Sequence, residues 1–117
     1  MQIKSSVKND SLFISLDGSL DELSLVNKTC TIITNPIVET MNNLINKTKA
    51  RKIVLDFSKV HSMDDFGIGF LIGRYKKAKD RNIPIYTLNL SKDFEELFDI
   101  KGKFNLCDFM PKFQEND

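Results

Sequence analysis

The sequence is poor in the side chains that bind metals or form disulfide frameworks. Its two cysteines, Cys30 and Cys107, lie far apart without the spacing of metal ligands, and His61 is the only histidine. A zinc site would therefore lack ligands. We expect both cysteines to be reduced, structural thiols, and we expect the protein to hold no metal or other cofactor.

Neither sign of charge prevails. Seventeen basic and sixteen acidic residues leave a formal net charge of +1, so no global attraction to nucleic acid or anionic membranes is expected. Basic clusters at 47–52 and 74–81 alternate with helix-face residues and show no aromatic stacking pattern, which favours solvated surfaces over nucleic-acid contacts. A partner must be recognised by a local surface.

Long apolar runs are also missing. No stretch approaches the roughly 18 to 20 residues of a membrane span, and residues 1–6 lack the apolar core of a signal peptide. We therefore expect a cytoplasmic protein without direct membrane insertion. Its 117 residues, with 41% hydrophobic content and three prolines, fit one compact domain. We place this domain at residues 1–113 and expect a frayed tail at 114–117.

The N-terminal third predicts an antiparallel hairpin. A short strand closes at Val7, residues 9–10 signal a turn, and residues 12–16 read as a second strand that ends at residues 17–18. Residues 19–34 give a weaker signal, and we interpret them as a loop with a possible strand.

The middle of the chain predicts a helix followed by a buried strand. Asn35 is a candidate N-cap, and Pro36 suits the first helical position. The apolar residues that then recur at helical spacing are Ile37, Val38, Met41, Leu44 and Ile45. After a basic turn at 49–52, residues 53–57 form a short apolar run suited to a central strand.

The C-terminal third predicts a strand at 84–88 and a helix that Ser91 caps and Gly102 ends. A last edge strand is expected at 104–109. Strands that alternate with helices after an initial hairpin imply an α/β fold with a mixed sheet and helices packed on it, because strand-helix-strand crossovers return parallel.

The most informative stretch is residues 63–69, which join the central strand to a helix. Asp64 and Asp65 stand at the junction, where unpaired N–H groups and the helix dipole favour negative charge. Asp64 and Asp65 are interpreted either as a simple helix cap or as a metal-binding or phosphorylatable pair. Response-regulator receivers, which are phosphorylated on an aspartate, need further acids after their first strand and a lysine after a later one, and this sequence does not provide that arrangement. His61 has no plausible triad partner and is expected in a loop.

The helix after this junction has two apolar faces. Ile68, Leu71, Ile72 and Tyr75 share one face, and Phe66, Phe70, Gly73 and Lys77 lie nearly opposite. Packing on a sheet requires one face, so Phe66 and Phe70 are either covered by a neighbouring element or exposed for a partner.

Three glycines, Gly67, Gly69 and Gly73, punctuate the same helix. No lysine-serine or lysine-threonine pair follows them, which argues against a phosphate-binding loop. We expect them to permit close approach by the sheet or by a partner.

Six segments together resemble the STAS domain family, named for sulphate transporters and anti-sigma factor antagonists. They are Gly18-Ser19-Leu20-Asp21, Ile53-Val54-Leu55-Asp56-Phe57, Met63-Asp64, Gly67-Ile68-Gly69, Ile72-Gly73-Arg74-Tyr75-Lys76 and Leu97-Phe98-Asp99-Ile100-Lys101-Gly102. The sequence is most similar to the small anti-sigma factor antagonists of bacteria. The resemblance implies a non-enzymatic regulator that binds an anti-sigma factor of the serine-kinase type and so frees a sigma factor.

The resemblance also implies a site. In these antagonists the aspartate that matches Asp64 precedes a serine or threonine that the anti-sigma factor phosphorylates, and this chain has Asp65 there. The next residue, commonly small, is Phe66. A permanent carboxylate cannot be esterified by such a kinase, and phosphate would carry roughly −1.5 to −2 charges. Either Asp65 imitates the phosphorylated state, or the partner has adapted and uses Phe66; modification at Ser58 or Ser62, in the expected strand-to-helix loop, is a third possibility.

We therefore predict a docking surface on the turn and helix from Met63 to Phe70. The predicted partner-binding residues are Asp21, Met63, Asp64, Asp65, Phe66, Gly67, Ile68, Phe70 and Arg74. An alternative function is that of a STAS adaptor or structural subunit in a larger complex, such as a membrane transport assembly, where a constitutive interface tolerates more apolar surface.

Overall fold

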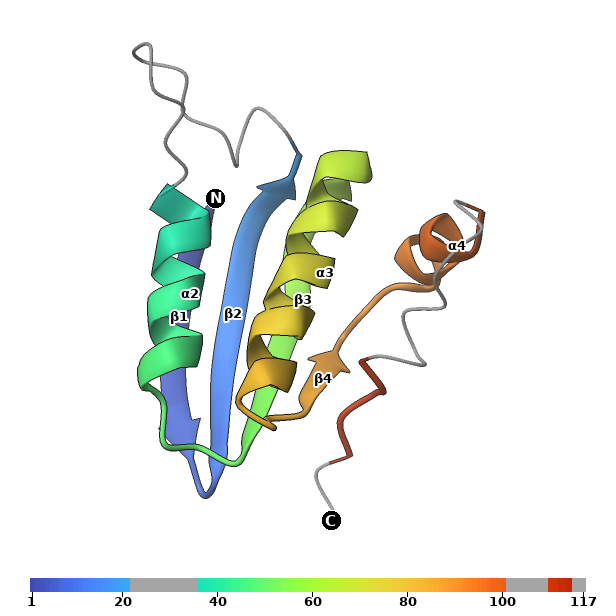
Figure 1. Ribbon diagram of the computed structural model, residues 1–117. Coiled ribbons are helices and arrows are strands. Elements are labelled where there is room, and N and C mark those ends of the chain that lie inside the picture. Colours follow the sequence, from blue (N-terminus) through green and yellow to red (C-terminus); the bar gives the residue numbers. More distant parts are fainter. Residues whose placement is uncertain (22–35, 101–109, 115–117) are drawn as a thin grey trace, which may run out of the picture.

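The computed structural model describes residues 1–21, 36–100 and 110–114, without the side chains of Pro36 and residues 97–100. These residues form a sheet that carries two helices side by side on one face, with a third helix beyond its far edge (Figure 1). The elements in chain order are β1 (Gln2–Lys8), β2 (Ser11–Leu20), α2 (Pro36–Lys47), β3 (Lys52–Met63), α3 (Asp65–Asp80), β4 (Ile85–Leu88) and α4 (Lys92–Ile100).

The sheet is mixed, as predicted. Its strand order is β1-β2-β3-β4, in which β1 and β2 are antiparallel and the other neighbours are parallel. The hairpin turns at Asn9, whose φ of 57° is a value that asparagine tolerates better than most residues. The predicted hairpin is therefore confirmed, and the two parallel crossovers place α2 and α3 on the same face.

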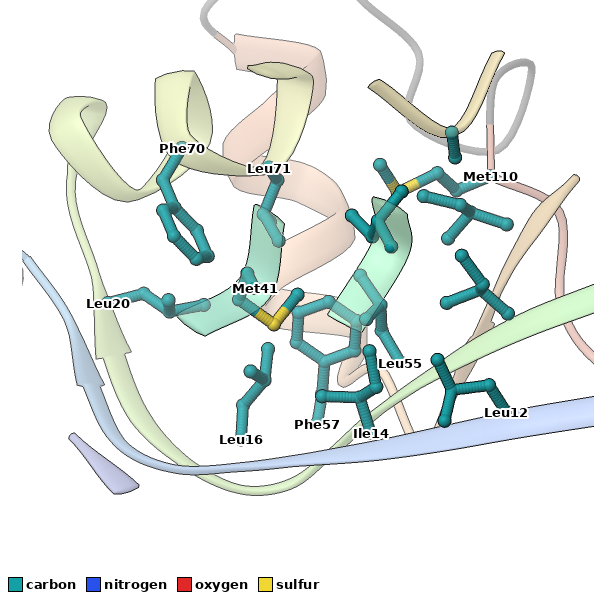
Figure 2. Close-up of a cluster of buried hydrophobic side chains, with 14 of the residues drawn as sticks. Leu12, Ile14, Leu16, Leu20, Met41, Leu55, Phe57, Phe70, Leu71 and Met110 are labelled. Carbon is teal, nitrogen blue, oxygen red and sulfur yellow. The ribbon is translucent and has the colours of Figure 1, made fainter. Parts of the chain in front are cut away.

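The core lies between the sheet and these two helices. It contains alternate residues of β2 and β3 together with the inner faces of α2 and α3 (Figure 2). Met41 and Ile45 are fully buried, which confirms the predicted apolar stripe of α2. After α3, the guanidinium of Arg81 donates to the carbonyl oxygens of Ile45 and Thr48 and so joins the C-terminal ends of the two helices.

The helix-free face of the sheet has a smaller apolar cluster. Phe13, Val54 and Tyr86 are register partners across three strands, and the ring of Phe113 meets Phe13 edge-on at 5.5 Å and Tyr86 at 6.0 Å between centroids. Val54 is completely buried although it does not belong to the main core. Phe113 therefore helps to cover this side of the sheet.

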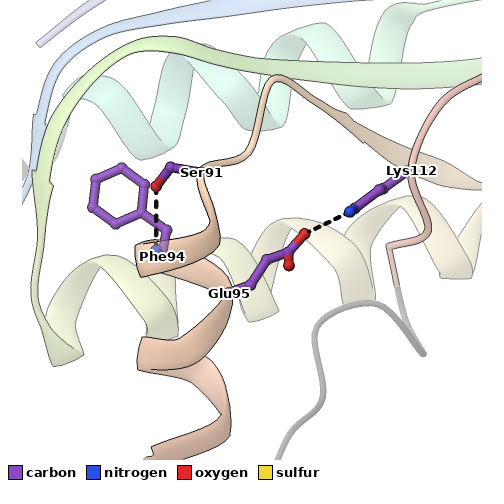
Figure 3. A network of polar contacts seen from close by, with 4 residues as sticks. All are labelled: Ser91, Phe94, Glu95 and Lys112. Atoms are coloured by element: carbon purple, nitrogen blue, oxygen red, sulfur yellow. Dashed lines mark hydrogen bonds and ion pairs between the residues drawn. The ribbon is translucent and has the colours of Figure 1, made fainter.

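The C-terminal segment is attached along β4. Thr87 exchanges two backbone hydrogen bonds with it, accepting from Phe113 N–H and donating to the carbonyl of Pro111. Lys112 forms an ion pair of 3.0 Å with Glu95 of α4, and Ser91 accepts from the N–H of Phe94, which confirms it as the cap of α4 (Figure 3). The edge strand predicted at 104–109 lies outside the described residues.

Two strand ends differ from the prediction. β2 continues to Leu20 instead of ending at residues 17–18, and β3 continues to Met63 instead of ending at Phe57. The cause is strand pairing, because Leu20 is the register partner of Met63. The polar extensions of the two strands satisfy each other's backbone hydrogen-bonding groups. His61 is therefore in a strand and not in a loop. Residues 22–35, including the candidate cap Asn35, and Gly102 lie outside the described residues.

Candidate functional site

The junction between β3 and α3 is a single residue, Asp64. Its backbone is extended, with φ −121° and ψ −172°, and its Oδ1 accepts a hydrogen bond of 3.0 Å from the N–H of Gly67. The side chain therefore satisfies one of the N–H groups that the first turn of a helix leaves unpaired. Asp64 is an N-cap, which confirms that part of the prediction.

The start of α3 is pressed against the end of β2. The N–H of Asp64 donates to the carbonyl oxygen of Leu20 at 3.1 Å, and a Cβ added to Gly67 would lie 2.0 Å from that same oxygen. No real side chain tolerates such a distance, so only glycine fits. The expected close approach to the sheet is thus made by Gly67.

Asp65 and Phe66 point away from the core. Asp65 is exposed in the first turn of α3, where the helix dipole stabilises its carboxylate, and Phe66 is 41% exposed. Met63, the last residue of β3, and Asp21, the first residue after β2, are both half-buried. Within the described residues no group of three His, Cys, Asp or Glu side chains is placed to hold a metal ion.

Gly69 and Gly73 continue the line of Phe66 along α3. They follow it by three and seven residues and therefore share its side of the helix. A Cβ added at either glycine would meet nothing within 4 Å. We call Asp65, Phe66, Gly69 and Gly73 the open face of α3. The sequence suggested close approach at these glycines but not which of them face a partner, because that depends on where the sheet lies.

Four of the predicted partner-binding residues are buried, which corrects the predicted surface. Gly67, Ile68, Phe70 and Arg74 belong to the covered side of α3, with 6% exposure for Phe70 and 8% for Arg74. Figure 2 shows Phe70 pointing toward Leu20 and Met41. The predicted face that contains Phe66 and Phe70 is therefore only partly covered. Phe70 belongs to the core, and Phe66 is exposed. Of the other five predicted residues, Asp64, Asp65 and Phe66 are exposed, and Asp21 and Met63 are half-buried.

Arg74 is an unusual core residue. Its guanidinium carbon lies 5.2 Å from the centroid of the Phe70 ring, a cation–π distance. Its Nε and Nη1 have no hydrogen-bond acceptor among the described residues, and burial lowers the pKa of the guanidinium. The arginine stays charged, since its ordinary pKa is far above neutrality. It stacks on Phe70 within the core and is not exposed for a partner, contrary to its prediction as a partner-binding residue.

The two serines considered for modification lie in β3 and not in a loop, and both are exposed. The N–H of Ser58 donates to Oδ1 of Asp56 at 2.9 Å. Ser62 pairs with Ser19 at the end of the strand, three residues before Asp65. Ser62 is therefore the hydroxyl nearer to the open face.

Asp56 fixes the connection after β4. Its Oδ1 also accepts from the side-chain amide of Asn89 at 3.1 Å. Burial alone raises the pKa of the Asp56 carboxyl, but the hydrogen bonds from Ser58 and Asn89, with the charge of Lys59, outweigh burial and lower it below the ordinary value.

This lowered pKa predicts a pH dependence of stability. A carboxyl with a depressed folded-state pKa stabilises the protein above its unfolded pKa, about 3.9, and loses that contribution as pH falls through the folded value. We expect Asp56→Asn to lower the free energy of unfolding by about 1 kcal/mol at neutral pH. Urea denaturation should show this difference constant above about pH 5 and shrinking below pH 4; a difference that grows in acid would contradict it.

The STAS domain family model matches residues 3–116. The chain belongs to the STAS family. A curated relative of this STAS domain is the anti-sigma F factor antagonist of Paenibacillus polymyxa, 23% identical over 106 residues that cover 91% of this chain and 83% of the relative. The predicted family is thus confirmed.

Two solved structures share its fold. The anti-sigma factor antagonist SpoIIAA in its unphosphorylated form has a TM-score of 0.61 and 20% identity, covering 85% of this chain and 83% of its own. The Bacillus cell fate determinant SpoIIAA in the phosphorylated form has a TM-score of 0.65 and 21% identity, covering 98% and 94%. The α/β STAS architecture is therefore confirmed. No helix within the described ranges is long and apolar enough to cross a membrane.

Proposed function

We propose that this STAS domain is a non-enzymatic anti-sigma factor antagonist. It binds an anti-sigma factor of the serine-kinase type through the open face of α3 and so frees a sigma factor, without a phosphorylation switch at Asp65. The observation that carries the proposal is the pair Asp65-Phe66, exposed at the start of α3. The relative from Paenibacillus polymyxa supports the class of partner. We place the interaction in the cytoplasm, because sigma factors act where transcription takes place.

The open face has the composition of a small docking surface. Phe66 offers an aromatic anchor, the type of residue that carries much of the energy of interfaces. Open space at Gly69 and Gly73 allows a partner to reach the helix backbone. The exposed side chains of Lys76 and Lys77 follow on the same helix and supply a polar rim.

Asp65 has no hydroxyl group for a kinase to esterify, so binding should not depend on a kinase reaction at this residue. Of the two hypotheses for Asp65, we favour an adapted partner. Phe66 supports this choice, because an exposed aromatic side chain beside the carboxylate supplies a contact that a smaller residue would not. If Asp65 imitated the phosphorylated state, it would instead keep the protein from binding the anti-sigma factor, and the sigma factor would not be freed.

The substitution Asp65→Ser tests this choice. If the partner has adapted, the Kd for the purified anti-sigma factor changes by about fivefold or less, because exposed ion pairs contribute roughly 1 kcal/mol at most. Isothermal titration calorimetry gives the Kd, and Asp65→Asn is the control that removes only the charge. Binding that becomes more than about tenfold tighter in both variants would show that Asp65 imitates phosphate.

Phosphate transfer gives an independent reading of the same variants. With the anti-sigma factor and ATP, Asp65→Ser is expected to gain phosphate, whereas the natural chain is not. Mass spectrometry of the natural chain checks Ser58 and Ser62 in the same samples. Phosphate on Ser62 would contradict the proposal that the protein lacks a phosphorylation switch. The switch would then be Ser62, at the end of β3.

A further inference from the structure

The outer edge of β1 has no partner strand in the described part of the chain, because β1 ends the sheet. Val7 is 67% exposed, more than Phe66, which is the other exposed large apolar side chain of the described part of the chain. An exposed apolar edge strand is a template for pairing with another chain.

Apolar surface continues from this edge toward α2. Val7 and Ser5 line a shallow groove of about 450 Å³ between β1 and α2, to which Leu12 and Leu44 also contribute. Ile3, Ser5 and Val7 alternate along β1 and so lie on the helix-bearing side of the sheet. Ile3 packs partly against the core, which leaves Val7 as the main exposed apolar residue of the edge.

We propose that a second copy of this chain occupies this edge. The two β1 strands pair antiparallel about a two-fold axis at Ser5, which joins the two sheets into one. Ile3 of each copy then lies opposite Val7 of the other, and Ser5 lies opposite Ser5. A two-fold pairing of this kind keeps the helices of both copies on the same side, so residues of the same parity must face each other.

The lysines of β1 select this register. A shift of the partner strand by two residues in one direction places Lys4 opposite Lys4 of the second copy, and a shift in the other direction places Lys4 opposite Lys8. Like charges directly opposite each other destabilise a pair of strands. In the register centred on Ser5, Lys4 instead faces Ser6, and no lysine faces a lysine.

Charge complementarity also favours the register centred on Ser5. Lys8 of the second copy lies opposite Gln2, and Gln2 is the register partner of Asp17 on β2. Strands are about 4.8 Å apart, so a lysine side chain reaches across one strand toward this carboxylate. The two-fold axis repeats the pair, which gives two Lys8–Asp17 attractions in the dimer.

Sedimentation velocity of the full chain tests the proposal. We expect a concentration-dependent monomer–dimer equilibrium that Val7→Lys weakens by at least about tenfold, because each dimer loses two buried valines and gains two charges. Phe66→Lys is the matched control on α3 and should leave dimerisation unchanged. A monomer at every soluble concentration would overturn the proposal. So would a dimer that Phe66→Lys disrupts and Val7→Lys leaves intact.

A cysteine tests the register. In a chain that carries Cys30→Ser and Cys107→Ser, Ser5→Cys should give a disulfide-linked dimer on mild oxidation, because directly opposite strand residues lie within the Cα distance of a disulfide. Ser58→Cys, exposed on β3, is the control and should stay monomeric on a denaturing gel. Equal cross-linking by both variants would overturn the register.

Discussion

Gly67→Ala is expected to destabilise the folded protein by about 3 kcal/mol, at the upper end of the usual cost of overpacking. The added methyl group would lie 2.0 Å from the carbonyl oxygen of Leu20, which is backbone and has no alternative rotamer. Relief requires α3 to move away from β2, and this movement lengthens the hydrogen bond from Asp64 to Leu20. Urea denaturation monitored by circular dichroism measures the loss.

Gly69→Ala is the matched control for this substitution. It lies two residues further along the same helix, where an added Cβ meets nothing within 4 Å. Alanine has the higher helix propensity, so the variant should be more stable than the natural chain by roughly 0.5 to 1 kcal/mol. Equal losses in the two variants would mean that the close contact between α3 and β2 is not what requires glycine.

Phe66→Ala is expected to weaken binding of the anti-sigma factor by about 30-fold, which corresponds to roughly 2 kcal/mol for an aromatic anchor. The free energy of unfolding should change by less than about 0.5 kcal/mol, because the ring is exposed and not part of the core. Isothermal titration calorimetry and urea denaturation of the same preparation separate the two effects.

Val7→Ala is the matched control for Phe66→Ala. Val7 is the other exposed large apolar residue of the described part of the chain, and it lies on β1, outside the open face of α3. Its substitution should leave partner affinity unchanged. If Val7→Ala weakens partner binding as much as Phe66→Ala does, the partner does not dock specifically on α3.

The turns, helix caps and apolar stripes of this fold could be predicted because each depends on residues that are close together in the sequence. The turn at Asn9, the stripe containing Met41 and Ile45, and the caps Asp64 and Ser91 each depend on residues within a few positions of one another. All of them appear in the structure as expected. The alternation of strands and helices then sufficed for the mixed sheet, because crossover connections are right-handed and return parallel.

The rest depends on contacts between distant segments. The polar end of β3 is a strand only because β2 pairs with it, and the sequence of residues 58–62 carries no apolar alternation that would reveal this. Phe66 and Phe70 are chemically alike, and only the position of the sheet and α2 decides which one is buried. Arg74 shows the same limit, since a charged side chain predicts exposure and here stacks on Phe70.

The most direct test of the proposed function is to identify the partner by affinity capture from the native cells, with Phe66→Asp as the negative control. The proposal predicts that the natural chain recovers a kinase-type anti-sigma factor and that the Phe66→Asp variant does not, although both variants fold equally well by circular dichroism. Recovery of a membrane transport subunit in its place would contradict the proposal and favour a STAS adaptor in a larger complex.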